Sequence, residues 1–222
     1  MHAIGIDVGS TNVKVVLLDD GGGIVADATR PLSTVTLGDS VSQDPDGLWA
    51  AVADAVRQVT GAAPEAAHDV SAIGVCSQYS SLVPVDEQGG AVAPIKMYLD
   101  SRGSEACWAI IERRPDAFET WVAHHGIPPI GAGLTLSHLL HFQQDEPDVH
   151  ARTANYLEVM DLVNLRLTGR AAATQCTMFA AQLCDNRSVG TTEYDADLLD
   201  MAQLDADRLP ELIPVDGAVG EV

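Results

Sequence analysis

The sequence has little positive charge. Lys and Arg number 12 against 32 Asp and Glu, which gives a formal net charge of −20 at pH 7. Nucleic-acid binding needs Lys and Arg to neutralise phosphates, and attraction to anionic membranes depends on the same side chains. The composition therefore argues against a nucleic-acid partner and against adhesion to a membrane surface.

The sequence also lacks a run of about 20 apolar residues, which a membrane-spanning helix needs. Its N-terminus shows no basic segment or cleavage pattern of a signal peptide. The four cysteines form no C-x-x-C pair, so neither a zinc ribbon nor a thioredoxin-like site is indicated. We therefore expect a cytoplasmic protein whose thiols are reduced.

Several common nucleotide and catalytic motifs are absent. The chain has no G-x-x-x-x-G-K-[ST], no G-x-G-x-x-G after its first strand and no G-x-S-x-G, so a P-loop, a Rossmann site and a hydrolase elbow are not supported. His138 and His141 lie three residues apart on an expected helix, and two such imidazoles can share a metal. No third ligand stands nearby in a fitting pattern, so packed or solvent-facing histidines are favoured.

The first twenty residues carry the clearest pattern of the chain. A short apolar strand, residues 4–6, ends on the carboxylate of Asp7, and a second strand covers residues 13–18. Between them lies a polar turn that contains Gly9, Ser10, Thr11 and Asn12. Such a turn points N–H groups and hydroxyls into one concavity that suits an anion, and Asp7 could hold Mg²⁺ beside a nucleotide phosphate. The alternative is a polar hairpin turn that Asp7 merely caps.

The rest of the chain predicts an α/β domain. A third strand over residues 24–31 completes an antiparallel meander, and Asp44-Pro45-Asp46 starts a helix that Gly61 ends. Residues 70–77 are apolar enough for the centre of a sheet. Further elements are expected as a strand at 82–85 and helices at about 102–114, 116–125, 135–144, 161–167 and 194–202. This order suggests one domain with a helical insertion after about residue 100.

Two polar segments follow apolar strands in the middle of the chain. Gln78-Tyr79-Ser80-Ser81 offers amide, phenol and hydroxyl groups at a strand end, where α/β sheets bind ligands, and these groups suit a polyhydroxylated ligand. The alternative is an ordinary polar loop. Asp100 and Arg102 are either a helix cap with a surface charge or a buried pair beside a polar ligand.

Taken in order, these segments resemble one family, the FGGY carbohydrate kinases, and within it the xylulokinase-like branch. The opening is similar to the family's phosphate hairpin, D-x-G-[ST]-[ST]-x-x-[KR]. Five further segments that resemble family motifs are SQDPDGLWAAV, SAIGVCSQYSSLVPVD, PIKMYLDSRG, TLSHLLHFQQDEPDVHAR and MDLVNLRLTGR. The resemblance covers nearly all 222 residues.

The resemblance implies a ribonuclease H-like fold of the actin–hexokinase type, with a mixed sheet, flanking helices and a helical insertion. Residues 1–222 would form the N-terminal domain of an ATP-dependent kinase for a ketose, a pentulose such as xylulose, or a polyol. Asp7 would hold Mg²⁺ through water near the transferring phosphoryl group. The residues implied at the ATP phosphates are Gly9, Ser10, Thr11, Asn12 and Lys14, and those implied at the sugar are Gln78, Tyr79, Ser80, Asp100 and Arg102.

Some residues depart from the family pattern. Tyr79-Ser80 stands where the family has Met-His, and His138 and His141 replace a Lys and a Trp. The family's general-base Asp would lie beyond Val222, in a C-terminal nucleotide domain, so we expect this chain alone to be inactive. A non-catalytic, actin-like nucleotide- or sugar-binding module is the alternative. The sequence leaves open which sugar is bound and whether the protein forms a homodimer.

Overall fold

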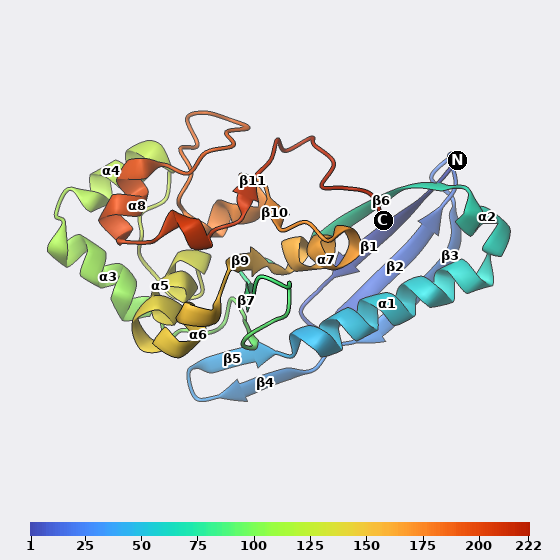
Figure 1. The fold of residues 1–222 in the computed structure, drawn as a ribbon, viewed down its shortest axis with the longest axis horizontal. Coiled ribbons are helices and arrows are strands. Elements are labelled where there is room, and N and C mark those ends of the chain that lie inside the picture. The colour runs from blue at the N-terminus through green and yellow to red at the C-terminus, as the bar shows by residue number, and fades with distance from the viewer. The chain divides into compact units, whose positions relative to one another are not determined.

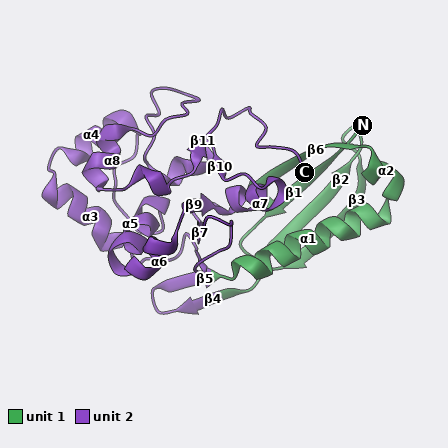
Figure 2. Cartoon of the chain, viewed as in Figure 1, with its two compact units in different colours: residues 1–34, 43–78 green, residues 35–42, 79–222 purple.

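The computed structural model describes residues 1–222, and they form two compact units (Figure 2). The first unit comprises residues 1–34 and 43–78, and the second comprises residues 35–42 and 79–222. Each unit contains strands and helices, which agrees with the predicted α/β class. The single domain expected over residues 1–222 stays a prediction.

The first unit contains a four-stranded sheet with the order β3-β2-β1-β6. Its strands are β1 (His2–Val8), β2 (Asn12–Leu18), β3 (Ile24–Pro31) and β6 (Val70–Ser77). The first three strands run antiparallel as the predicted meander, and β6 pairs with β1 in parallel. Two helices join β3 to β6 within this unit, α1 (Pro45–Ala62) and α2 (Pro64–His68).

The core of this unit follows from two periodicities. Val13, Val15 and Leu17 alternate along β2 and are fully buried, as expected when one face of a strand lies against a helix. Helix α1 packs on β2 and β3 through residues at helical spacing, among them Leu48 and Val52 (Figure 1). The predicted helix start is confirmed, because the Asp44 carboxylate accepts hydrogen bonds from two N–H groups of the first turn.

The prediction that residues 70–77 lie in the centre of a sheet is wrong for this chain. Strand β6 pairs only with β1 in the observed sheet order and forms its edge. Ala72, Gly74 and Cys76 are exposed. An apolar run of small residues satisfies the pattern of a central strand, yet its side chains bury little surface. The pattern therefore does not distinguish a strand in the centre of a sheet from one at its edge.

The second unit is built on a five-stranded sheet with the order β4-β5-β8-β7-β9. Its strands are β4 (Thr34–Leu37), β5 (Ser40–Gln43), β8 (Ile95–Lys96), β7 (Leu82–Val85) and β9 (Asn155–Glu158). Only β7 is among the predicted strands. The other four span two to four residues each, too few to show a clear alternation of apolar and polar side chains.

The second unit also contains six helices (Figure 1). They are α3 (Ser104–Arg113), α4 (Ala117–His124), α5 (Thr135–Asp145), α6 (Pro147–Arg152), α7 (Val159–Thr168) and α8 (Ala196–Ala202), with short 3₁₀ turns η1 (Thr177–Ala181) and η2 (Ala206–Arg208) and the pair β10 (Ala172–Ala173) and β11 (Glu211–Leu212). Trp121, Phe142 and Tyr156 are the largest side chains of their common core. None of the helices combines the length and the apolar character needed to cross a membrane.

Candidate active site

The predicted phosphate hairpin is formed by β1 and β2. Asp7 and Lys14 are directly opposite each other across the two strands, and Lys14 Nζ lies 4.0 Å from Asp7 Oδ2. The turn closes through a hydrogen bond of 2.9 Å from the N–H of Gly9 to the carbonyl of Asn12. A Cβ at Gly9 would lie 3.2 Å from that carbonyl oxygen, so the turn favours glycine.

Asp7 keeps an accessible carboxylate. Half of its side-chain surface is exposed. Its side-chain contacts are with Lys14 Nζ, 4.0 Å from Oδ2, and with the Cys76 thiol, which donates to Oδ1 over 3.7 Å. Burial and then the charge of Asp7 raise the pKa of Cys76, which keeps this thiol protonated. A single free carboxylate fits Mg²⁺, because this cation is commonly held by one or two carboxylates together with waters and substrate phosphates.

Gln43, which lies in the segment SQDPDGLWAAV and has no predicted role of its own, supports the hairpin. Its side chain is 2% exposed, and its Nε2 donates to the Ser10 carbonyl over 2.7 Å and to the Thr34 hydroxyl over 3.1 Å. Its Oε1 accepts from Gln78 Nε2 at 2.8 Å. Gln43 thus links the turn of the hairpin to the first predicted sugar-binding residue. The available signal was a lone amide directly before the Asp-Pro cap.

In the second unit, the buried Asp100 pairs with Arg102, whose side chain stays partly exposed. The Asp100 carboxylate is fully buried and accepts from the backbone N–H of Val41 at 3.1 Å. It also accepts from the Arg102 backbone N–H and guanidinium, with the closest contact, to Nη2, at 2.7 Å. Burial alone would raise the pKa of Asp100, but the hydrogen bonds from Arg102 and Val41 lower it below its usual value.

This arrangement separates the roles of the two residues. All the donors to Asp100 come from the protein, so its carboxylate holds Arg102 in place, whereas the Arg102 side chain is 31% exposed. Two glycines let helix α5 and the chain before it approach the segment around Asp100. A Cβ at Gly103 would lie 1.9 Å from the Ser137 carbonyl oxygen, and a Cβ at Gly133 would lie 1.9 Å from the Tyr98 carbonyl oxygen.

A buried lysine that the sequence analysis did not identify joins this cluster. Lys96 is 2% exposed, its Nζ lies 2.6 Å from Glu146 Oε1 and 3.3 Å from His141 Nδ1, and it sits 4.2 Å above the centre of the Phe142 ring. Arg102 Nη1 is 3.5 Å from the same Glu146 oxygen. Burial and the neighbouring cations lower the pKa of His141, which is therefore neutral and can accept a hydrogen bond from the Lys96 ammonium group through Nδ1. A cavity of about 410 Å³ is lined by Arg102 and His141.

The segment Tyr79–Ser81 presents its predicted sugar-binding residues unequally. Tyr79 is 53% exposed, whereas Ser80 is 1% exposed and has a φ of +49°. The Ser80 hydroxyl lies 3.1 Å from the Thr135 hydroxyl, which in turn donates to the buried carboxylate of Glu158. Of the two, only Tyr79 lies where it can meet a ligand, and Ser80 belongs to a network inside the unit.

The helix α5 histidines are packed rather than exposed. His138 is fully buried, and neither ring nitrogen has a hydrogen bond of normal geometry. Burial lowers the pKa of His138 to about 4, although the nearby Ser80 backbone and Asp100 offset part of this effect. Of the two arrangements expected for His138 and His141, packed and solvent-facing, the structure shows the packed one.

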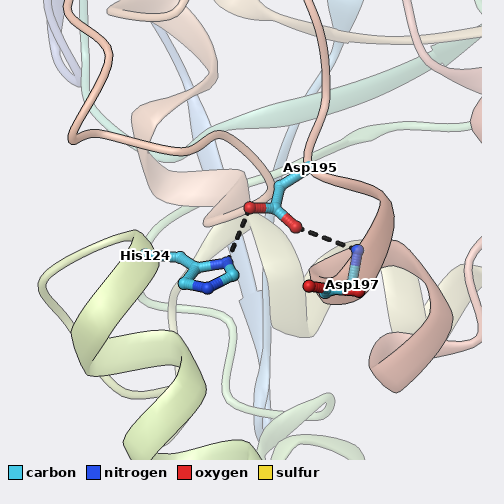
Figure 3. A group of neighbouring side chains, drawn as sticks. All are labelled: His124, Asp195 and Asp197. Atoms are coloured by element: carbon cyan, nitrogen blue, oxygen red, sulfur yellow. Dashed lines mark hydrogen bonds and ion pairs between the residues drawn. The ribbon is translucent and has the colours of Figure 1, made fainter.

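A separate group of possible metal ligands contains His124, Asp195 and Asp197 (Figure 3). His124 Nδ1 lies 2.7 Å from Asp195 Oδ2, and the other Asp195 oxygen accepts from the Asp197 and Leu198 N–H groups at the start of α8. These bonds are those of a helix cap and of a hydrogen bond between a histidine and a carboxylate. They explain the group without an ion, and none of the predicted site residues belongs to it.

Comparison with known proteins places these features in a family. The model of the FGGY family of carbohydrate kinases, N-terminal domain, matches residues 2–222. Xylulose kinase of Escherichia coli (strain K12) is 28% identical over 211 residues, which is 94% of this chain and 41% of that protein. The chain thus spans less than half the length of the relatives it matches.

Solved structures agree in fold. The xylulose kinase of Rhodospirillum rubrum superposes with a TM-score of 0.88 over 99% of this chain and 44% of that one, at 22% identity. Plasmodium falciparum glycerol kinase, solved with ADP, superposes with a TM-score of 0.81 at 15% identity. The predicted ribonuclease H-like fold is confirmed, and the chain belongs to the FGGY family of carbohydrate kinases.

Proposed function

We propose that the protein carrying this chain transfers the γ-phosphoryl group of ATP to a hydroxyl of a ketose or polyol, with a pentulose such as xylulose as the first candidate. The observation that carries this proposal is the β1–β2 hairpin, where the accessible side chains of Asp7 and Lys14 lie 4.0 Å apart beside a tight glycine turn. Family membership supports the reaction class, and the cytoplasmic location remains part of the proposal.

In this proposal the hairpin binds the phosphates. The turn from Gly9 to Asn12 offers N–H and hydroxyl groups, and Lys14 contributes an accessible positive charge, because its side chain is 63% exposed. Asp7 holds Mg²⁺ through water, and the cation neutralises the charge that develops on the transferring phosphoryl group. Gln43 keeps the hairpin turn in register with Gln78.

All the predicted sugar-binding residues except Gln78 belong to the second unit. Tyr79 and Arg102 are the accessible groups among the predicted residues, and a guanidinium donates hydrogen bonds in a fixed fork. Asp100 acts through Arg102, since its own oxygens are occupied by protein donors. Tyr79 stands where the family has Met, so the sugar-binding part of the site is where a difference in substrate is most expected.

A second domain completes the site in this proposal. During transfer the sugar oxygen bonds to the γ-phosphorus, the bond from this phosphorus to the ADP oxygen breaks, and the hydroxyl proton passes to a general base. No residue of this chain matches the family's general-base Asp, and the chain spans 41–44% of its relatives. A base contributes roughly 10²–10⁴-fold, so we expect no turnover by residues 1–222 alone.

A coupled assay of ADP release tests the proposal. The 222-residue chain and the whole protein that contains it are compared with D-xylulose, D-ribulose and glycerol as acceptors. Turnover is expected only for the whole protein and only with some acceptors. Turnover by the chain alone contradicts the need for a second domain. Nucleotide or sugar binding by the whole protein without turnover for any acceptor favours the non-catalytic module.

A further inference from the structure

Glu158 is a buried acid that the proposed reaction does not use. It is the last residue of β9 and is 4% exposed. Its Oε2 accepts from the Ser81 backbone N–H at 2.9 Å, and its Oε1 accepts from the Thr135 hydroxyl. Its neighbour Val159 donates to the Ser81 carbonyl at 3.1 Å. Both backbone polar groups of Ser81 are therefore held by the junction of β9 and α7.

The same network reaches the exposed Tyr79. The Ser80 hydroxyl lies 3.1 Å from Thr135, and the Ser81 hydroxyl donates to the Tyr79 carbonyl at 3.2 Å. Ser80 adopts φ +49°, a left-handed conformation that costs a non-glycine residue roughly 1 kcal/mol or more. Such a backbone persists only where its surroundings hold it, and here the holding contacts converge on the Glu158 carboxyl group.

The titratable groups around Glu158 do not neutralise a negative charge. Tyr79 lies on the segment itself, His138 on α5 and Asp161 on α7. Burial, and after it a negative charge on Glu158, raises the pKa of both Tyr79 and Asp161. His138 is uncharged at neutral pH. Across β7, Lys96 and Glu158 are both paired with Leu82, but the ammonium group of Lys96 is directed at Glu146. Burial raises the pKa of Glu158 to about 7, and its hydrogen bonds offset only part of that rise.

Both protonation states can satisfy the hydrogen bonds, but only one avoids a buried charge. The neutral carboxyl donates to Thr135 and still accepts from Ser81, whereas the ionised carboxylate accepts from both. Hydrating the ionised form requires water to reach Glu158. The segment between Glu158 and the exposed Tyr79 is the short strained stretch at Ser80, so water can enter when this stretch opens. Ionisation therefore favours local opening of this stretch.

We propose that neutral Glu158 is a positioning residue that holds the Tyr79–Ser81 segment in its binding conformation, and that ionisation of Glu158 releases this segment. The role in sugar recognition rests on the proposed function, whereas the holding contacts are independent of it. Affinity for a polyhydroxylated ligand then falls as the pH rises through neutrality, and Glu158→Gln, which imitates the neutral acid, removes this dependence.

The test combines amide hydrogen exchange with D-xylulose binding by calorimetry, both at about pH 6 and about pH 8, on the whole protein. In the wild type, protection of the Ser81 amide relative to E158Q is expected to fall about tenfold over this range, because each pH unit above the pKa lowers the neutral fraction up to tenfold. D-xylulose affinity should fall in parallel. Glu119→Gln, an exposed acid on α4, should follow the wild type.

Thr135→Val provides a second variant that removes the hydroxyl link and should lower Ser81 protection at both pH values. Equal pH profiles of Ser81 protection in the wild type and E158Q overturn the holding role, whatever the binding result. Profiles that differ as expected, with no D-xylulose binding at either pH, overturn the role in recognition of this sugar and count against the proposed substrate. Differing profiles with parallel affinity changes support both.

Discussion

The two units carry their predicted functional groups in different ways. In the first unit, Asp7 and Lys14 stand on a regular hairpin with accessible side chains. In the second, Asp100 is buried in a network and only its partner Arg102 is accessible. A hairpin is specified by neighbours in sequence, whereas a buried network is specified by residues far apart. Chemistry and stability are therefore expected to respond differently to substitution in the two units.

Asp100→Ala should have the largest effect on stability. The substitution leaves the buried Val41 N–H without its acceptor and removes the charge-assisted hydrogen bonds of Arg102, and each of these losses costs about 1–3 kcal/mol. Urea unfolding measures the loss. Asp185→Ala is a matched control, because Asp185 contacts the Arg187 backbone N–H and guanidinium with the same spacing near the surface. If the free energy of unfolding fell equally in D100A and D185A, the burial of Asp100 would not be the reason for its contribution to stability.

Glu158→Gln should change how stability depends on pH. The ordinary pKa of Glu158 is 4.5 and that in the folded protein is about 7. Between these values the folded protein keeps a proton that the unfolded chain releases, so the free energy of unfolding falls as the pH rises from about 4.5 to 7. The total loss is about 3 kcal/mol.

Unfolding in urea across this pH range, for the wild type and E158Q, checks the prediction. The free energy of unfolding of the wild type should fall relative to that of E158Q as the pH rises. The difference between the two free energies should become constant above about pH 7. A difference that does not vary with pH would show that Glu158 stays ionised in the folded protein. Glu119→Gln again controls for the removal of one acid.

Asp7→Asn should affect chemistry without affecting stability. Loss of a preorganised charge at the transferring group typically costs on the order of 10²-fold in turnover, while the half-exposed side chain contributes little to folding. The coupled ADP assay and thermal unfolding of the whole protein measure the two effects. Asp27→Asn, an exposed acid on β3 of the same sheet, is the control. A D7N protein with unchanged turnover would remove Asp7 from the phosphate site.

The sequence predicted well those features that depend on neighbouring residues. The meander β1–β3, the capped start of α1 and the strand β7 follow from alternation, turn residues and an N-cap aspartate, all within a few positions of one another. The hairpin around Gly9 is predictable for the same reason. The family motifs identified the family, although they gave no side-chain contacts.

The sequence could not predict the buried networks. Lys96 follows an isoleucine in an apolar segment, and nothing local indicates that its ammonium group meets Glu146, 50 residues later. Glu158 ends a four-residue strand and contacts Ser81, 77 residues earlier. The sheet that brings them together consists largely of strands of two to four residues, so its pairing depends on tertiary packing rather than on a local pattern.

Gln43→Ala gives the smallest expected effect. It tests both kinds of feature at once, because a buried amide here supports a hairpin that neighbouring residues in the sequence specify. The substitution removes donors to Ser10 and Thr34 and the acceptor of Gln78, which should lower the free energy of unfolding by about 1–2 kcal/mol. The Ser10 carbonyl then loses its only side-chain donor, so the turn from Gly9 to Asn12 should loosen and the KM for ATP should rise severalfold. Gln88→Ala, in an exposed turn after β7, is the control. A KM that stays constant while stability falls would mean that Gln43 stabilises the fold without positioning the phosphate hairpin.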